Sequence, residues 1–168
     1  MKIKISGLEN GTYNYDFDDD IEVIELEEPF YGKYKTNVVL NKFDDQIILE
    51  ASSSVMANFV CDRCSTEYDR SVESEYKMVY LLRNVYDKEE AIDVTYLSPQ
   101  TDKIDISKDV RDYIILSVPM KKLCKEDCKG LCYKCGIDLN EGDCDCTDEE
   151  TDERWNKLLE LKNKLNKN

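Results

Sequence analysis

Eight cysteines dominate the chemistry available to this chain of 168 residues, which contains no histidine. They form four closely spaced pairs: Cys61 and Cys64, Cys124 and Cys128, Cys132 and Cys135, and Cys144 and Cys146. Zinc binds thiolates tetrahedrally, and a structural zinc site is commonly completed by two such pairs. Because no imidazole is available, a closed site here needs four cysteines. The four pairs therefore predict two structural Zn²⁺ ions.

The spacing also suggests how the pairs divide between the two sites. Gly136 directly follows the third pair, and glycine in this position is typical of a zinc knuckle because it accepts positive φ. The fourth pair begins eight residues after that glycine, at Cys144. This favours a local site made by the last two pairs and a long-range site made by the first two. The rival arrangement joins the two CxxC pairs in one site and leaves the CxxxC and CxC pairs for the other.

Other uses of the thiols are weaker expectations. The N-terminal residues lack the apolar run of a signal peptide, and no stretch of about 18 apolar residues occurs anywhere. We therefore expect a cytoplasmic protein without a membrane segment. In a reducing compartment, closely spaced cysteines indicate metal or redox chemistry more than a disulfide framework. Iron–sulfur ligation remains an alternative, although the ferredoxin spacings do not match.

The distribution of charge limits the partners. The formal net charge of -14 argues against broad binding to nucleic acid, which needs clustered Lys and Arg. Residues 1–30 carry two lysines against nine acids, whereas residues 120–135 carry five lysines against two acids. Lysines beside the cysteines either offset the negative charge of zinc thiolates or present a basic patch to RNA. The candidate contact residues are Lys121, Lys122, Lys125, Lys129 and Lys134.

The elements expected to position the cysteines are mostly strands. Apolar residues alternate in most of the first hundred residues, and Asp44-Asp45 predicts a hairpin turn. A second hairpin is expected over residues 55–82, with the first CxxC pair at its turn, where a metal knuckle disturbs no ladder hydrogen bonds. Residues 84–104 are polar and contain Pro99, so they are expected to form a loop or a partly ordered crossing segment.

Two helices complete the expected fold. Ser107 is the predicted N-cap of a helix that runs to Ser117, with Pro119 ending it. An amphipathic helix is expected after the cysteines, beginning at Thr147 or Thr151. The sequence thus predicts an α+β protein whose N-terminal half is an antiparallel β-rich unit. We expect two domains: residues 1–119, with the CxxC hairpin and a covering helix, and residues 120–168, with a zinc-knuckle module and a terminal helix.

No catalytic residue is predicted. Without histidine there is no Ser-His or Cys-His arrangement, and the phosphate-binding and metalloprotease motifs are absent from the sequence. A thioredoxin-like CxxC would begin a helix in a βαβ unit, whereas this CxxC is expected at a β-hairpin. Paired cysteines that complete four-thiolate sites also leave no open metal position. We therefore expect a protein that is not an enzyme and has no small-molecule substrate.

Three sequence segments together resemble the YceD family, the large ribosomal RNA subunit accumulation proteins. They are CDRCSTEY, VPMKKLCKEDCKGLCYKCGIDLNEGDCDC and DERWNKLLELK. Tyr133 and Glu153 stand where the family often has proline, and neither departure removes a cysteine. The resemblance implies a non-enzymatic factor, found in bacteria and plastids, that supports accumulation of large-subunit rRNA and hence ribosome assembly.

The resemblance also implies the partners, which are large-subunit rRNA, a ribosomal protein or an assembly intermediate. Because the chain is acidic, we expect it to act at selected points: a zinc-ordered basic edge touches rRNA, or acidic faces hold a basic ribosomal protein. The number of thiols keeps a second function open, a thiol redox switch or zinc-storage protein. An iron–sulfur electron carrier is a third.

Overall fold

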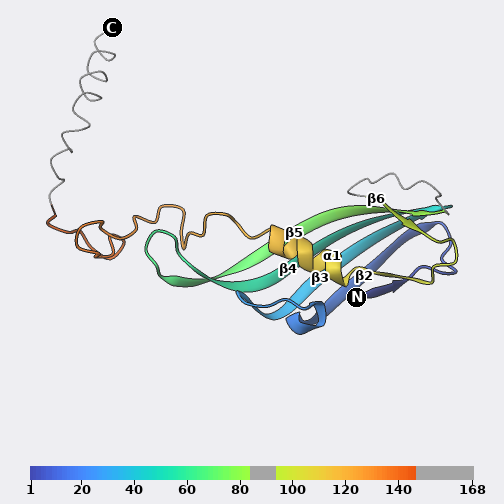
Figure 1. Ribbon diagram of the computed structural model, residues 1–168, viewed down its shortest axis with the longest axis horizontal. Helices are drawn as coiled ribbons and strands as arrows, with labels where there is room; N and C mark the ends of the chain where they lie inside the picture. The colour runs from blue at the N-terminus through green and yellow to red at the C-terminus, as the bar shows by residue number, and fades with distance from the viewer. Residues whose placement is uncertain (84–93, 147–168) are drawn as a thin grey trace, which may run out of the picture.

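A computed structural model describes residues 1–83 and 94–146. Its main element is a five-stranded sheet with the strand order β2-β3-β4-β5-β6 (Figure 1). These strands are β2 (Gly11–Asp20), β3 (Phe30–Phe43), β4 (Gln46–Val60), β5 (Glu67–Leu82) and β6 (Val94–Leu97). The remaining elements are the paired strands β1 (Lys2–Lys4) and β7 (Lys103–Asp105), the 3-10 helix η1 (Ile21–Ile24) and the helix α1 (Ser107–Leu116).

The sheet is antiparallel from β2 to β5, as predicted, but β6 pairs with β5 in the parallel direction. The expectation of a loop or a partly ordered crossing segment over residues 84–104 did not include the strands β6 and β7. Both strands are short and have one or no fully buried residue, so they show little of the alternation that identifies a strand in sequence. The helix expected from Thr147 or Thr151 lies outside the described residues.

One face of the sheet forms the core. Alternate residues of β3, β4 and β5 are buried, while their neighbours face solvent. Helix α1 covers the buried face with Val110 and Ile114, which are fully buried, and with Tyr113, whose ring stacks on Tyr76 at a centroid distance of 4.5 Å. The covering helix predicted for the N-terminal unit is therefore present.

The start of α1 differs from the prediction. Ile106 occupies the N-cap position, and Ser107 is the first helical residue. The backbone N–H of Ser107 donates to the Asp105 carboxylate at 3.1 Å, and this bond lowers the pKa of Asp105. The Ser107 hydroxyl instead accepts a hydrogen bond from the Met1 ammonium group. The side-chain hydrogen bond to the backbone at this helix start is therefore made by Asp105, and the Ser107 hydroxyl bonds the Met1 ammonium group.

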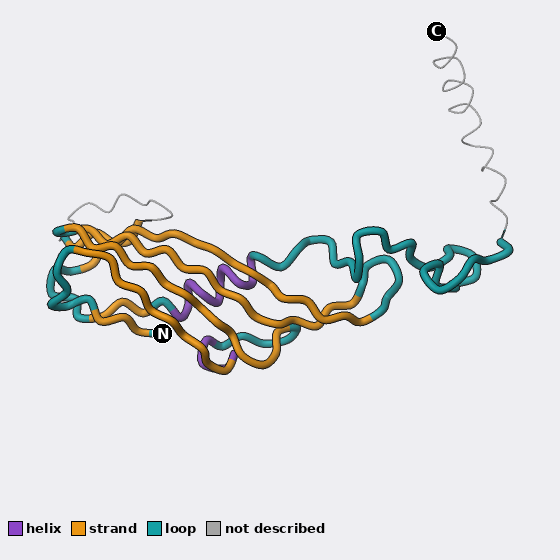
Figure 2. The backbone as a smooth tube through the Cα atoms, turned by 180° about the vertical axis from the view of Figure 1, so that it is seen from behind, coloured by secondary structure: helices purple, strands orange, loops and turns teal. Residues whose placement is uncertain are grey.

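Both predicted hairpin turns are present. Phe43 pairs with Gln46 across Asp44-Asp45, and Val60 pairs with Glu67 across the first CxxC pair. The strands therefore carry this CxxC turn to the end of the sheet from which the cysteine-rich region continues (Figures 1 and 2). Among the described residues, no helix has both the length and the apolar character needed to cross a membrane.

Candidate metal centres

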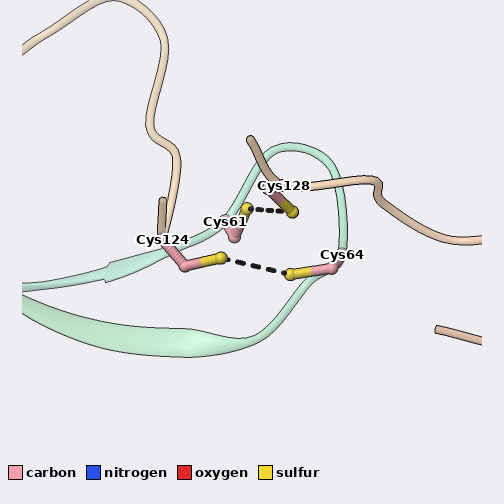
Figure 3. A group of neighbouring side chains, drawn as sticks. All are labelled: Cys61, Cys64, Cys124 and Cys128. Atoms are coloured by element: carbon pink, nitrogen blue, oxygen red, sulfur yellow. Dashed lines mark hydrogen bonds between the residues drawn. The ribbon is translucent and has the colours of Figure 1, made fainter. Parts of the chain in front are cut away.

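The first cysteine cluster joins the β4–β5 turn to the segment after α1. The Sγ atoms of its four cysteines, Cys61, Cys64, Cys124 and Cys128, lie within 4.8 Å of one another (Figure 3). Sγ of Cys61 is 3.8 Å from Sγ of Cys128, and Sγ of Cys64 is 3.7 Å from Sγ of Cys124. Four sulfurs at about 2.3 Å from a zinc ion in a tetrahedron are about 3.8 Å apart. The spacing therefore matches a four-thiolate metal site, and the cysteines are free thiols.

The hairpin turn fixes the first pair of this cluster. The N–H of Cys61 donates to the carbonyl of Thr66 at 2.9 Å, and the N–H of Ser65 donates to the carbonyl of Cys61 at 2.9 Å. Ser65 adopts φ of 59°, which closes the turn. Cys61 and Cys64 are both buried, and Cys61 continues the inward-facing alternation of β4 into the turn.

The two residues between these cysteines hold the returning chain. Asp62 forms a reciprocal pair with Lys122: its N–H donates to the Lys122 carbonyl at 2.8 Å, and its carboxylate accepts the Lys122 N–H at 2.6 Å. The Arg63 guanidinium donates to the Cys128 carbonyl at 2.6 Å, and the Arg63 carbonyl accepts the N–H of Leu131 at 3.0 Å. These contacts place the second pair opposite the first. The sequence analysis assigned no role to Asp62 or Arg63, whose only signal was their place inside the CxxC motif.

The second cluster is local. The Sγ atoms of Cys132, Cys135, Cys144 and Cys146 also lie within 4.8 Å of one another, and those of Cys144 and Cys132 are 3.4 Å apart. The predicted knuckle geometry is present, since Gly136 has φ of 73° and donates its N–H to the Cys132 carbonyl at 2.9 Å. This cluster lies beyond the end of the sheet (Figure 2), and Cys135 is exposed.

The cysteines gather in the division favoured from their spacing, and the rival arrangement does not occur. The first cluster takes one pair from each side of the domain boundary expected between residues 119 and 120. The boundary itself stays a prediction.

Asn140 connects the two clusters. It lies in the loop between the knuckle and the last cysteine pair, and its side-chain N–H reaches Sγ of Cys128 at 3.4 Å. Its side-chain carbonyl accepts the N–H of Lys129 at 2.9 Å. A residue of the second cluster's loop thus contacts a cysteine of the first. This role of Asn140 was not predicted from the sequence, where its only signal is its position in the run CGIDLN.

The pKa values of the thiols differ within each cluster. Burial opposes ionisation of Cys61, but backbone N–H groups, including those of Cys64 and Arg63, outweigh it and lower its pKa to about 6. Backbone N–H groups of the knuckle likewise lower the pKa of Cys132 to about 6. Burial and neighbouring thiols raise the pKa of Cys124 to about 12. Each cluster therefore contains one thiol that ionises readily, whereas ionisation of Cys124 is opposed, and a divalent metal would favour the thiolate of both kinds.

The candidate contact lysines lie along the chain around both clusters. Lys121, Lys125 and Lys129 are exposed, whereas Lys122 is half-buried, with its ammonium group 5.5 Å from the centroid of the Phe59 ring. The ammonium group of Lys134 lies 6.0 Å from the Tyr133 ring centroid. Their contact with RNA or protein stays a prediction.

The family comparison covers both clusters. The family described as "Large ribosomal RNA subunit accumulation protein YceD" matches residues 49–162, which include all eight cysteines. The chain belongs to the YceD family. The sequence resemblance is thereby confirmed. No solved structure matches the chain.

Curated relatives match shorter segments of this YceD protein. The "Large ribosomal RNA subunit accumulation protein YCED homolog 1, chloroplastic" of Arabidopsis thaliana is 38% identical over 73 residues, covering 44% of this chain and 23% of the plant protein. The protein of the same name in Zea mays is 48% identical over 50 residues, covering 29% and 17%. An uncharacterized protein of Mycobacterium tuberculosis is 36% identical over 58 residues, covering 34% and 28%. The chain thus matches less than a third of the length of these relatives.

Proposed function

We propose that this YceD-family protein is a non-enzymatic binding factor, stabilised by two structural zinc ions, that supports accumulation of large-subunit rRNA during ribosome assembly. The observation that carries the proposal is the family match, which spans both cysteine clusters. The names of the two plant relatives support the biological role.

Zinc suits both clusters because each offers four sulfur ligands, and no fifth group is needed to close a tetrahedral site. Bound zinc would supply structural cross-links and favour ionisation of Cys124, which burial and neighbouring thiols oppose. In the first cluster, Asp62 and Arg63 would hold the two ligand pairs opposite each other through their contacts with Lys122 and Cys128. The role of this chain's own residues is therefore positioning, with no group assigned to a chemical step.

The charge of the loaded protein bears on how it meets its partner. A zinc ion with four thiolates has a net charge of -2, so two sites take the formal charge of the chain from -14 to -18. An extended contact with the rRNA backbone would then be opposed electrostatically. We propose that contact with rRNA, if it is direct, is confined to the lysines of residues 121–134.

A genetic experiment tests the role in ribosome assembly. In cells that lack the gene, we expect the ratio of large- to small-subunit rRNA to fall and the large-subunit peak in a sucrose gradient to shrink. The wild-type gene should restore both, and a Cys128→Ser gene should restore neither at equal protein level. An unchanged rRNA ratio in the deletion strain would rule out the proposed function.

Exposure of Cys135 favours the second candidate function, a thiol redox switch or zinc store. Under that function, mild peroxide would release zinc, reduction would restore it, and partner binding would change in step. Release of zinc without any change in partner binding counts against it. Zinc that stays bound under peroxide counts against it as well.

A further inference from the structure

An apolar groove runs between the segment that joins η1 to β3 and the C-terminal end of α1. It has a volume of about 590 Å³. Leu26 and Phe30, both buried, line one side, and Ile115 and Val118 line the other. The Ile115 side chain is 49% exposed although it adjoins this core. The groove therefore offers apolar surface that the described chain leaves uncovered.

The rim of the groove is acidic. Glu27 and Glu28 are exposed, and neither forms an ion pair with any residue that the structure describes. Glu25 pairs with Arg111 at 2.9 Å, and the same guanidinium contacts Asp112 at 3.2 Å, so the one arginine of the rim is already engaged. Residues 16–28 together contain eight acids and no basic residue. The field at the groove is therefore negative.

Two more apolar side chains are exposed close to the groove in the sequence. Leu116 is 77% exposed, and Met120 is fully exposed, on the segment that also carries Ile115 and Val118. Isolated exposed apolar residues are ordinary, but an apolar groove that leaves Ile115 half exposed is typical of an interaction site. Its acidic rim would repel phosphate groups and attract lysine and arginine.

We propose that this groove binds a basic protein segment, with an aliphatic or aromatic side chain against Ile115 and Val118 and cationic side chains beside Glu27 and Glu28. The inference rests on the proposed function and names its partner as protein at this surface. The groove contains no cysteine, so it is an interaction surface separate from the two clusters. Lys122 lines the groove, and its backbone N–H donates to Asp62 in the first CxxC turn, so this residue links the groove to the first cluster.

The test uses the full-length zinc-loaded protein and a synthetic peptide that alternates arginine and leucine, with binding followed by calorimetry. A peptide with serine in place of leucine keeps the charge and should bind at least about tenfold more weakly, because the groove loses its apolar occupant. Added salt should also weaken binding, because the cationic side chains face exposed carboxylates.

Two pairs of matched variants locate the site. Glu27→Lys with Glu28→Lys should weaken peptide binding at least about tenfold. Glu73→Lys with Glu75→Lys makes the same change of net charge on the solvent-facing side of β5, and should leave the affinity within about threefold, since that surface lacks the groove. Ile115→Ser should weaken binding, whereas Ile137→Ser, which changes a residue of similar exposure outside the groove, should not. Circular dichroism confirms that each variant is folded.

Equal loss of affinity in both charge-reversed variants, or full affinity in both, overturns the assignment to this groove. The function itself is tested separately by the rRNA ratio of the deletion strain. Suppose that the deletion strain has reduced large-subunit rRNA and that the Glu27→Lys, Glu28→Lys gene restores it fully. This result would overturn the proposed role of the groove and leave the proposed function standing.

Discussion

The two cysteine clusters have the same ligand set but different relations to the fold. The first joins cysteines 60 and 67 residues apart, and its Cys61, Cys64 and Cys128 are buried beside Tyr68 and Leu123. The second is complete within residues 132–146, and its Cys135 is exposed. Closing a loop of 60 residues removes more conformational freedom from the unfolded chain than closing one of 12, by about 1.4 kcal/mol, and it also ties the sheet to the segment after α1. The first cluster should therefore stabilise the whole protein, and the second mainly its own loop.

The clusters also differ in what holds their ligands in place. A β-hairpin, with hydrogen bonds along β4 and β5, positions half of the first cluster before any metal binds. The second has only the turn around Gly136, the isolated bridge between Leu131 and Asp138, and the contact of Asn140 with the first cluster. A module of this size seldom folds without a metal. We expect the second cluster to need zinc for an ordered structure. We expect zinc at the first cluster mainly to raise the free energy of unfolding of the whole protein.

The largest expected difference comes from removing one ligand of each cluster. Cys61→Ser and Cys132→Ser should each lower the zinc content by one ion. In urea titrations followed by circular dichroism of the sheet, Cys61→Ser should lower the free energy of unfolding by about 3 kcal/mol or more, and Cys132→Ser by less than about 1 kcal/mol. Equal losses in the two variants would refute the distinction between a global and a local site.

Alanine substitution of two glycines compares the chain between the clusters, at Gly130, with the second knuckle, at Gly136. Gly130 and Gly136 both have positive φ, at 80° and 73°, so alanine at either costs about 1–2 kcal/mol for the left-handed conformation. A Cβ at Gly130 would also lie 2.9 Å from the Arg63 carbonyl oxygen, whereas a Cβ at Gly136 meets nothing within 4 Å. We expect Gly130→Ala to lower the thermal midpoint clearly more than Gly136→Ala. The same midpoint in both variants would mean that the backbone at Arg63 shifts at little cost to make room for the added Cβ.

Asn140→Ala should weaken the first cluster from within the second loop. It removes the N–H contact with the Cys128 sulfur and the acceptor for Lys129, and groups that support metal ligands in this way typically alter metal affinity about tenfold or more. Zinc transfer to a chromophoric chelator, with cysteine alkylation mapped over time, should show faster exposure of Cys128. Asn58→Ala, which removes an exposed amide contact with Asp69, provides the control. Unchanged alkylation of Cys128 would show that the two clusters are independent.

The smallest difference is expected in the pH dependence of the zinc-free, reduced protein. The pKa of Cys61 and that of Cys132 are both lowered to about 6. A lowered pKa means that the thiolate stabilises the folded state above the ordinary thiol pKa, and that this contribution is lost as pH falls through about 6. Ultraviolet thiolate absorbance should therefore show a step near pH 6 that Cys61→Ser reduces more than Cys132→Ser does, because the knuckle that lowers the pKa of Cys132 depends on zinc for its order. Equal reduction by both variants would contradict this.

Parts of both clusters followed from local sequence rules. The alternation of residues 55–61 and 68–82 placed the first CxxC pair at a hairpin turn, and the glycine after Cys135 identified the knuckle. The roles of Asp62, Arg63 and Asn140 did not follow, because each depends on a chain segment that tertiary packing brings alongside. The same limit applies to β6 and β7, which are too short to show a pattern and are defined by the strands they pair with. It also applies to Asp105, whose carboxylate accepts the Ser107 N–H at the start of α1.

The most direct test of the central claim, two separately closed four-cysteine zinc sites, is native mass spectrometry combined with mapping of the cysteines that zinc protects from alkylation. The wild-type protein should carry two zinc ions and protect all eight cysteines. Cys132→Ser should carry one zinc ion and protect only Cys61, Cys64, Cys124 and Cys128. A single zinc ion in the wild-type protein, or protection of Cys135 together with Cys61 in the variant, would contradict the account.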